Sequence, residues 1–391
     1  MNIIYVGAFR LPNKDAAAAR VLSNAKAMKA LGHCITFISW GGEYRDEDLQ
    51  SDGKYRVDGM EYIITREIDA SGSFFNKLYS VFVRGKLSFE LIKNAITKPD
   101  LIILYNADGG WTQKILGYCK SNGIKLANDI TEWYSNNELH FWDIIPYYIN
   151  MHYVQKKVKN KILISKYLCN YYDASNNVYL PPLCDQSEPK WSLNIKDERV
   201  PTFAGITLFY AGNPARKDCV HTVINVVNKL CHQGKKLRFI IAGPEKDVYI
   251  NQYHDILDGG KLHDNIVFLG RVSQDSIPAY YKCADFMILL REPSRKNMAG
   301  FPTKFAESIS SGIPVIANNT SDLDDYIVDN ETGFIIPSQD ADSLEKIIVD
   351  KVLNLSRNEI EKMKADTVAM KSVFDIRTYQ TSINSFLSNL Q

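Results

Sequence analysis

The first forty residues alternate between short apolar runs and one amphipathic segment. Apolar residues occupy most of 2–6, a loop is predicted at 7–15, and residues 16–31 carry apolar positions at the spacing of a helix. Gly32 stands where glycine commonly ends a helix, and a second apolar run occupies 34–40. The pattern predicts a strand, a loop, a helix and a second strand, which together form a βαβ unit of a parallel sheet covered on both faces.

The same alternation recurs along the chain and is interrupted once. A polar stretch punctuated by prolines fills 181–206 and separates two series of apolar runs. The further predicted strands are 101–105, 124–127, 162–165 and 178–180 before this stretch, and 207–211, 237–242, 265–269, 285–290, 313–317 and 333–336 after it. The sequence therefore predicts an α/β protein of two doubly wound, Rossmann-like domains facing a cleft. We place the domains at 1–183 and 207–371, with a linker at 184–206 and a terminal helix at 372–391.

The loops after the strands carry the candidate chemistry, because ligands of such sheets bind beyond the carboxyl ends of the strands. The chain has no GxG among its 22 glycines, no GxxxxGK[ST] and no GxSxG. These absences argue against dinucleotide-binding enzymes, P-loop NTPases and α/β-hydrolases. The tripeptide DxD occurs in three separate acidic turns. Since a hard cation needs several converging oxygens, we expect no metal site.

Composition and charge narrow the class of protein further. Lys plus Arg number 46 and Asp plus Glu 45, so the formal net charge is +1 and we expect no nucleic-acid partner. No apolar run approaches the roughly 18 to 20 residues that span a bilayer, and the first residues lack the basic region of a signal peptide. The seven cysteines are scattered without a CxxC pair, which favours a reduced, cytoplasmic protein without structural zinc.

The segment after the strand at 285–290 combines a helix start with paired charges. Pro302 suits the first turn of a helix, and Lys304 and Glu307, three residues apart, share one face of it. A helix N-terminus offers free N–H groups and a positive dipole to a phosphate, and a carboxylate one turn further can accept hydrogen bonds from a ribose diol. The alternative is an exposed Lys–Glu pair on an ordinary crossover helix.

The loop after the strand at 207–211 carries a glycine followed by adjacent cations. Gly212, Arg216 and Lys217 fit a phosphate clamp at the same edge of the sheet. The alternative is a solvated loop in which Asp218 is the N-cap of the next helix. Two such loops in one domain favour the phosphate-binding interpretation.

Longer motifs surround these residues in a specific order. Residues 299–307 take the position of an E-x7-E element, 308–317 match the pattern AxxxGxPVIA after its second glutamate, and 241–243 read Ile-Ala-Gly. With these motifs, nearly the whole chain resembles a retaining glycosyltransferase of family 4, and the resemblance implies the two-domain GT-B fold. Two positions depart from that family. Ala299 replaces the first glutamate of E-x7-E, and Asn213 replaces an arginine after the phosphate-loop glycine.

The resemblance implies roles for individual residues. It places the catalytic centre in the loop after the strand at 124–127, where Glu132 and then Asp129 are the candidates and a structural capping role is the alternative. The residues that it implies on the acceptor side are Phe9 and Arg10, in the loop after the first strand, with Asn106 and Asp108. The residues that it implies for donor binding are Gly212, Arg216, Lys217, Gly243, Gly300, Phe301, Pro302, Thr303, Lys304 and Glu307.

The resemblance also implies a reaction. We expect transfer of a sugar, with retention, from a UDP- or GDP-sugar to a glycan or a polyprenyl-diphosphate-linked acceptor. No metal or other cofactor is expected, and the implied setting is bacterial capsule, O-antigen or exopolysaccharide synthesis. Two alternatives stay open: a catalytically inactive partner subunit, favoured by Ala299, and a sugar-nucleotide epimerase of the same fold.

Two stretches of the first domain are rich in basic residues. Aromatic and basic residues mix at 74–98, and 153–167 holds five lysines and no acid. Such stretches raise an anionic membrane surface as a further partner, with the protein peripheral at the inner face of the membrane. The alternative is a solvated basic helix face.

Overall fold

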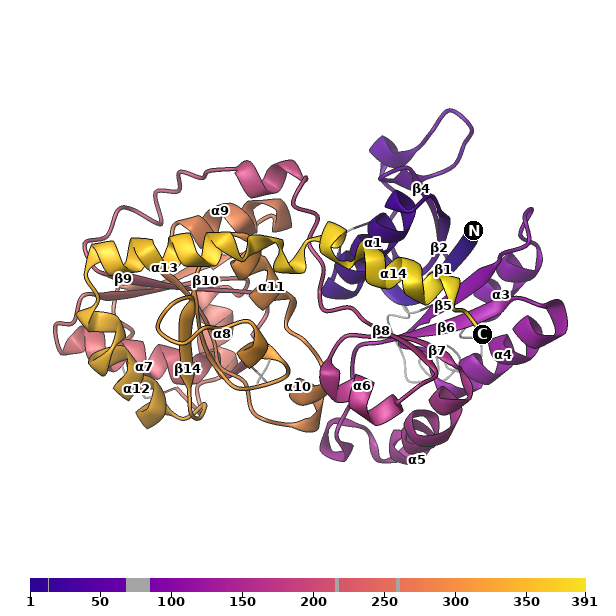
Figure 1. Cartoon of the computed structure of the whole chain (residues 1–391). Helices are drawn as coiled ribbons and strands as arrows, with labels where there is room; N and C mark the ends of the chain where they lie inside the picture. Colours follow the sequence, from indigo (N-terminus) through magenta and orange to yellow (C-terminus); the bar gives the residue numbers. More distant parts are fainter. Residues whose placement is uncertain (13, 68–84, 215–217, 258–260) are drawn as a thin grey trace. The chain divides into compact units, whose positions relative to one another are not determined.

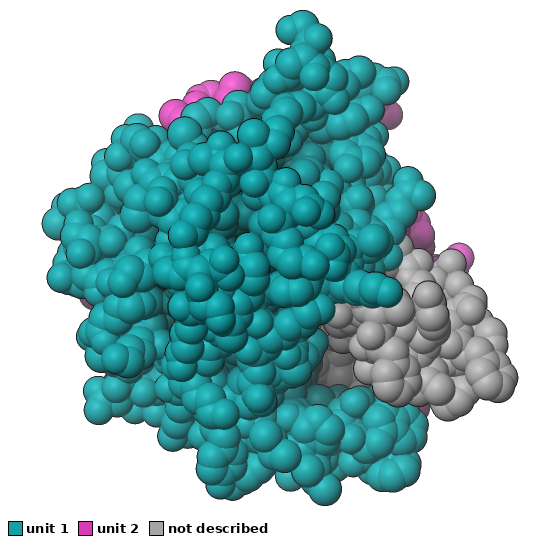
Figure 2. Space-filling view, turned by 90° about the vertical axis from the view of Figure 1, so that its right-hand side faces the viewer, with its two compact units in different colours: residues 1–183, 299–301, 376–391 teal, residues 184–298, 302–375 magenta. Residues whose placement is uncertain are grey.

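The computed structural model describes residues 1–12, 14–67, 85–214, 218–257 and 261–391, and Figure 1 shows their helices and strands. These residues form two compact units, which Figure 2 colours separately. The first unit comprises Met1–Leu183, Ala299–Phe301 and Ile376–Gln391, and the second comprises Cys184–Met298 and Pro302–Asp375. The stretch predicted as a linker, 184–206, falls within the second unit.

The first unit is built on an eight-stranded sheet of order β3-β4-β2-β1-β5-β6-β7-β8, in which β3 alone of the described strands runs antiparallel to its neighbour. Alternate residues of β1 face opposite sides of the sheet, so Tyr5 joins one buried cluster and Val6 joins the other. The strands are β1 (Asn2–Leu11), β2 (Cys34–Gly42), β3 (Arg56–Val57), β4 (Met60–Ile64), β5 (Leu101–Tyr105), β6 (Lys125–Ile130), β7 (Asn160–Leu163) and β8 (Asn176–Tyr179).

Helices cover both faces of this sheet. Asp15 caps the first of them, since its carboxylate accepts a hydrogen bond from Ala18 N at 2.8 Å. The terminal helix α14 packs on α1 and β8 (Figure 1), where Asn176 Nδ2 donates to Phe386 O at 3.1 Å. The helices are α1 (Ala16–Ala30), α3 (Lys86–Lys93), α4 (Gly109–Asn122), α5 (Phe141–Ile149), α6 (Lys166–Tyr172) and α14 (Gln380–Ser388).

The second unit is built on a parallel six-stranded sheet of order β11-β10-β9-β12-β13-β14. Its strands are β9 (Ile206–Ala211), β10 (Leu237–Ala242), β11 (Ile266–Gly270), β12 (Phe286–Leu289), β13 (Val315–Asn318) and β14 (Gly333–Ile336). Its helices are α7 (Val220–His232), α8 (Lys246–Gln252), α9 (Ile277–Lys282), α11 (Thr303–Ser310), α12 (Ala341–Asp350) and α13 (Arg357–Ala369), and α10 (Arg295–Ala299) leads back to the first unit at its last residue.

In each sheet the strand order reverses beside the first strand of the unit. Strand β1 lies between β2 and β5, and β9 lies between β10 and β12. Ligands of doubly wound sheets bind at the carboxyl ends of the strands at such a switch point. The two sheets confirm the predicted α/β class with two Rossmann-like domains. No helix in the described part of the chain is long and apolar enough to cross a bilayer.

Candidate functional site

The switch point of the second sheet holds a partly buried ammonium group beside backbone that carries no side chain. Lys304, in the first turn of α11, donates from Nζ to the Tyr210 hydroxyl at 2.6 Å and to Asp218 Oδ2 at 2.5 Å. Gly212 follows β9 with φ +132°, and a Cβ at this position would lie 3.1 Å from Lys304 Nζ. Only glycine meets both constraints without strain. Gly212 and Lys304, two of the predicted donor-binding residues, therefore lie together.

Asp218 joins the charges of this site. Its carboxylate also accepts hydrogen bonds from the Tyr210 hydroxyl at 2.7 Å and from Arg291 Nε at 3.0 Å, and its side chain is 2% exposed. Burial alone would raise the pKa of Asp218, but Lys304 and Arg291 lower it, so the carboxylate stays ionised. The alternative prediction, that Asp218 is an N-cap, is wrong because Cys219 holds the N-cap position of α7.

The cluster Asp218–Lys304–Arg291 has one negative and two positive groups, so its formal charge is +1. Burial lowers the pKa of Lys304 and the carboxylate of Asp218 raises it in part. Among the described residues, no hydrogen-bond partner reaches the buried Nη1 of Arg291. A buried site with one excess positive charge and a spare N–H donor is suited to an anionic ligand.

A second glycine, Gly243, lies next to Gly212, so this part of the site is also formed by backbone without a side chain. Gly243 follows β10 with φ +136°, and a Cβ there would lie 2.2 Å from the carbonyl oxygen of Gly212. The Gly212 N–H donates to Ala242 O at 2.9 Å, which ties the two loops together. Gly243 is therefore placed with Gly212, as the resemblance implied, and the close approach explains why both positions lack a side chain.

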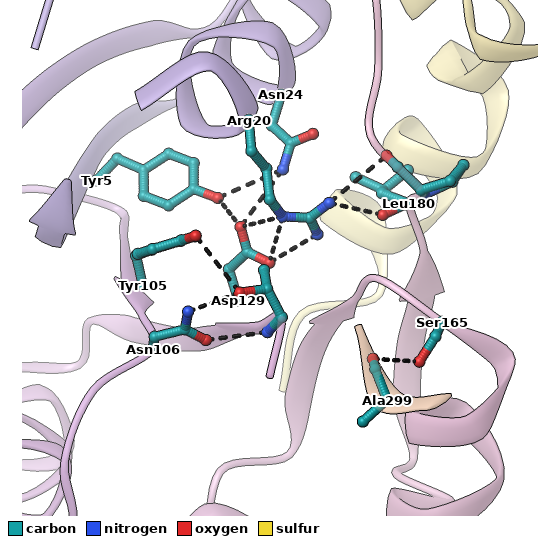
Figure 3. Close-up of polar contacts among 11 residues, drawn as sticks. Tyr5, Arg20, Asn24, Tyr105, Asn106, Asp129, Ser165, Leu180 and Ala299 are labelled. Atoms are coloured by element: carbon teal, nitrogen blue, oxygen red, sulfur yellow. Dashed lines mark hydrogen bonds and ion pairs between the residues drawn. The ribbon is translucent and has the colours of Figure 1, made fainter. Parts of the chain in front are cut away.

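The remaining donor-binding candidates lie at the start of α11, in the first unit, or outside the described residues. Pro302 is the N-cap residue of α11 and Thr303 its first residue, so both lie one turn or less from Lys304. Gly300 and Phe301 belong to the first unit, where the preceding residue, Ala299, accepts a hydrogen bond from Ser165 Oγ at 2.6 Å (Figure 3). Arg216 and Lys217 lie outside the described residues.

Glu307 lies one turn beyond Lys304 on α11. Burial raises the pKa of this carboxyl group, and Lys190 and Lys304 lower it in part. Among the described residues no donor forms a hydrogen bond with its side chain, while its backbone carbonyl accepts one from Ser311 Oγ at 2.8 Å. A partly buried carboxylate with spare acceptor capacity beside the cationic cluster can bind a hydroxyl donor such as a ribose diol.

The switch point of the first sheet opens into a pocket of about 320 Å³. Two predicted residues, Asn106 after β5 and Glu132 after β6, both line it. Asn106 is held in place by two bonds with Thr131: its Nδ2 donates to Oγ1 at 2.6 Å, and its Oδ1 accepts from the backbone N–H at 2.9 Å (Figure 3). The Glu132 carboxylate accepts a hydrogen bond from the Tyr134 hydroxyl, so a carboxylate is presented in a mainly uncharged pocket.

Asp129, at the end of β6, does not line this pocket and belongs to a buried polar cluster (Figure 3). Arg20 of α1 donates to its carboxylate, with Nη2 at 2.8 Å from Oδ1, and the Tyr5 hydroxyl also donates to it. Arg20 Nη1 extends the cluster to Leu180 O at 2.8 Å. Burial alone would lower the pKa of Arg20, but the Asp129 carboxylate raises it. With no exposed surface and both oxygens bonded, Asp129 has the geometry of a structural ion pair rather than of a group that meets substrate.

Two acceptor-side candidates, Phe9 and Arg10, lie in a strand instead of the predicted loop, and a third, Asp108, caps a helix. Strand β1 extends to Leu11, so Phe9 and Arg10 belong to the strand and not to a loop. The Phe9 ring is fully buried and meets that of Tyr5 edge to face at 6.2 Å. Arg10 is exposed and its Nη1 lies 3.3 Å from a carboxylate oxygen of Asp15. Asp108 caps α4, since its Oδ1 accepts from Trp111 N at 2.9 Å.

Only some of the lysines in the basic stretches of the first unit are exposed. Lys161 is buried in β7, and burial with the nearby Lys156 lowers its pKa to about 8, so the prediction that it belongs to a surface patch is wrong. Lys156, Lys157 and Lys159 are exposed. Most of the aromatic and basic residues predicted at 74–98 lie outside the described residues.

Sequence reasoning did not single out Tyr210, Asp218 as a charge partner, or Arg291. These three residues come together only through the topology of the sheet. Tyr210 lies in β9, Asp218 follows β9 and Arg291 follows β12, and these two strands are neighbours only in the folded sheet. Across the residues that the structure describes, no group of three or more His, Cys, Asp or Glu side chains could hold a metal ion.

One protein-family model matches the second half of the chain, and several known proteins are similar over shorter stretches. Residues 197–367 match the family Glycosyl transferases group 1. The chain is 25% identical over 129 residues to a GDP-mannose-dependent alpha-(1-6)-phosphatidylinositol monomannoside mannosyltransferase of Mycobacterium tuberculosis, covering 32% of each protein. It is 28% identical over 114 residues to the alpha-monoglucosyldiacylglycerol synthase of Streptococcus pneumoniae, covering 29% of this chain and 24% of that protein. These matches span a third or less of either relative and support a glycosyltransferase of group 1.

Comparison with solved structures covers both units. Sucrose-phosphate synthase from Thermosynechococcus elongatus superposes with a TM-score of 0.71 at 15% identity, covering 99% of this chain and 98% of that one. Anabaena Alr3699/HepE in complex with UDP-glucose superposes with a TM-score of 0.69 at 13% identity, covering 100% of both chains. At such identities the similarity shows the fold, and the predicted GT-B fold is confirmed.

Proposed function

We propose that this protein is a hexosyltransferase that takes a sugar from a nucleotide-sugar donor, with a UDP- or GDP-sugar as the expected donor. The match of residues 197–367 to the group 1 glycosyltransferases supports this assignment. The observation that carries it is the cluster of Asp218, Lys304 and Arg291, whose excess positive charge lies beside the bare backbone of Gly212 at the switch point of the second sheet.

The proposed chemistry needs this charge. The bond between the anomeric carbon and the diphosphate oxygen breaks, and its electron pair leaves with the nucleoside diphosphate. The acceptor hydroxyl oxygen forms the new bond to the anomeric carbon, and its proton passes to the departing diphosphate oxygen. Lys304 and Arg291 stabilise the charge that develops on the diphosphate, and cations held in advance within a protein site do so without reorganisation. We therefore propose a reaction that uses no metal or other cofactor, with Glu307 binding the ribose and with retention of configuration.

The acceptor side of the proposal rests on the pocket of the first unit. Glu132 and Asn106 present polar groups to it, and a sugar hydroxyl is a suitable partner for both. We propose Glu132 as the group that meets the acceptor, with Asp129 holding the strand end beneath it. The proposed acceptor is a glycan or a polyprenyl-diphosphate-linked sugar of bacterial capsule, O-antigen or exopolysaccharide synthesis, on the cytoplasmic side of the membrane.

A thermal-shift screen with UDP-, GDP-, ADP-, dTDP- and CMP-sugars tests the proposal. A ligand that binds only the folded state raises its stability by mass action, so one nucleotide should raise the melting temperature clearly above the others. Calorimetry with that nucleotide should then show that Glu307→Ala weakens binding by about 1 to 3 kcal/mol. Glu331→Ala, an exposed glutamate of the same unit, is the matched control and should bind as the wild type does.

One observation favours a second candidate, a partner subunit that does not catalyse transfer. Ala299 lacks the carboxylate that the resemblance implies for contacts with the donor sugar. The retained Lys304 and Glu307 argue for donor binding, since a subunit without it has no need of a buried excess charge. If no nucleotide sugar stabilises the protein at millimolar concentration, the partner subunit becomes the better assignment.

A further inference from the structure

Helix α5 of the first unit presents large apolar side chains to solvent. Phe141 is 78% exposed, Trp142 57% and Ile145 70%. The same surface continues with Tyr148 and Ile149 of α5 and with Tyr153 of the turn after it, which are between 45% and 60% exposed. The Tyr148 and Tyr153 rings lie 6.3 Å apart. Because Phe141, Ile145 and Ile149 are spaced by four residues, they share one face of the helix. We call the six residues the α5 face.

The exposed apolar residues of the α5 face lie together on one short segment of the chain. The other exposed large apolar residues of the described chain, such as Ile96, Val248 and Val328, lie far apart in the sequence. Single exposed apolar residues are normal on any protein, whereas a contiguous group marks a surface that contacts another apolar phase or molecule.

The opposite side of the same segment belongs to the acceptor pocket. Tyr147, Asn150 and Gln155 line the pocket. Asn150 Nδ2 and Gln155 Nε2 both donate to Ala107 O, at 3.1 and 2.9 Å, which fixes the segment to the loop after β5. The Tyr147 hydroxyl accepts from Tyr134 N at 3.0 Å. One short segment therefore has a pocket on its inner side and the α5 face on its outer side.

Charge identifies the occupant of the α5 face. Lys156, Lys157 and Lys159 follow directly after it and are exposed, and no ion pair of Lys157 or Lys159 is found among the described residues. The face itself includes one tryptophan and two tyrosines, residues that prefer the boundary between lipid and water. The three exposed lysines outnumber the exposed acid of α5, Asp143, so positive charge predominates beside the apolar side chains. Such a surface is the complement of an anionic bilayer, where acyl chains lie beneath negative headgroups.

We infer that α5 docks the first unit on an anionic lipid bilayer and thereby brings the acceptor pocket to a lipid-linked acceptor. The docking surface stands on its own, and the statement about the acceptor rests on the proposed function. The membrane surface would cover Phe141, Trp142 and Ile145, while the lysines contact the headgroups. A lipid-linked sugar would then enter the pocket past the inner side of the same segment.

Vesicle flotation of the full chain tests the inference. The wild type should float with vesicles of equal parts phosphatidylglycerol and phosphatidylcholine at about 0.1 M salt, and bind pure phosphatidylcholine weakly. The triple variant Phe141→Ser/Trp142→Ser/Ile145→Ser should lose about tenfold or more of this binding. Lys157→Gln/Lys159→Gln should lose several-fold, on the anionic vesicles only.

Control variants and measurements show whether a loss of vesicle binding comes from the α5 face, from misfolding or from altered nucleotide binding. Ile96→Ser/Val248→Ser/Val328→Ser removes three exposed apolar residues outside the α5 face and should float like the wild type. Circular dichroism and the nucleotide thermal shift should be unchanged in every variant. A wild type that stays in the aqueous phase, or a triple variant that floats undiminished, would overturn the inference. So would a wild-type dimer that the triple variant dissociates in analytical ultracentrifugation, because the occupant would then be a second copy. Failure of the proposed function is seen separately, as the absence of any nucleotide thermal shift.

Discussion

The switch points of the two units are built alike but differ in charge. In each, a buried carboxylate accepts a hydrogen bond from a tyrosine of the unit's first strand and pairs with an arginine. Among the residues that the structure describes, Asp129 faces one cation, Arg20, so its cluster is neutral. Asp218 faces two, Arg291 and Lys304, so its cluster keeps one positive charge.

This difference separates a structural role from a binding role. A neutral, hydrogen-bonded ion pair has no excess charge to attract a ligand, but it is costly to break and so fixes the strand ends around it. A cluster with an unmatched cation is stabilised further when an anion arrives. The comparison supports a structural role for the first cluster and the proposed diphosphate binding for the second.

Removal of Arg20 is expected to have the largest effect. Arg20→Met leaves Asp129 buried without a counter-charge and should lower the free energy of unfolding by about 3 to 5 kcal/mol. Urea denaturation followed by tryptophan fluorescence measures this loss, because four of the five tryptophans lie in the first unit. Arg56→Met is the control, since Arg56 pairs with Asp52 at the surface and should cost less than about 1 kcal/mol. Equal losses in the two variants would show that the buried pair has no special weight.

Lys161 is a buried lysine for which no carboxylate partner is found in the described part of the chain, whereas Lys304 pairs with Asp218. Burial, with a contribution from Lys156, lowers the pKa of Lys161 from 10.5 to about 8. Between these two values the unfolded chain holds the proton that the folded chain has lost, so the free energy of unfolding should rise with pH from about 8 to 10.5, by up to about 3 kcal/mol.

Denaturation at a series of pH values measures this rise. Lys161→Met should flatten it, and the exposed neighbour Lys159→Met should leave it intact. A rise that survives in Lys161→Met would have to come from another group.

Lys304→Met tests the unmatched charge directly. The substitution brings the second cluster to neutrality while Arg291 still compensates Asp218, so the fold should persist. Affinity for the nucleoside diphosphate selected by the thermal-shift screen should fall by about 2 kcal/mol, roughly thirtyfold, in calorimetry. Lys229→Met removes an exposed lysine of the same unit, paired with Glu345, and should bind normally. Unaltered binding by Lys304→Met would remove the excess charge from the donor site.

Much of the fold was predictable from the sequence because apolar runs report burial directly. The predicted strands 101–105 and 237–242 coincide with β5 and β10, and the helix predicted to start at Pro302 begins at Thr303. The extension of β1 was missed because Phe9 and Arg10 alternate in polarity after an apolar run, which is the pattern of a strand end with one face exposed.

The candidate sites were predictable only in part. Gly212 and Lys304 carry local signals, a glycine after a strand and a cation in a first helical turn. Asp218 carries a local signal for a different role, because aspartate before a helix is a favoured N-cap. Its partners Arg291 and Lys304 are 73 and 86 residues away, and only the order of the folded strands brings them to it.

The tyrosines of the two clusters give the smallest expected effect and the most direct comparison. Tyr5→Phe and Tyr210→Phe each remove a hydroxyl that donates to a buried carboxylate, so each should lower the free energy of unfolding by about 1 to 2 kcal/mol. The Tyr210 hydroxyl also accepts a hydrogen bond from Lys304, so Tyr210→Phe should weaken nucleotide binding by about 1 kcal/mol as well. Tyr5→Phe should leave nucleotide binding unchanged, because no group of its cluster meets the donor. Calorimetry and urea denaturation on the same two variants decide between the assignments. A loss of nucleotide affinity in Tyr5→Phe, or its absence in Tyr210→Phe, would contradict the division of labour between the neutral and the charged cluster.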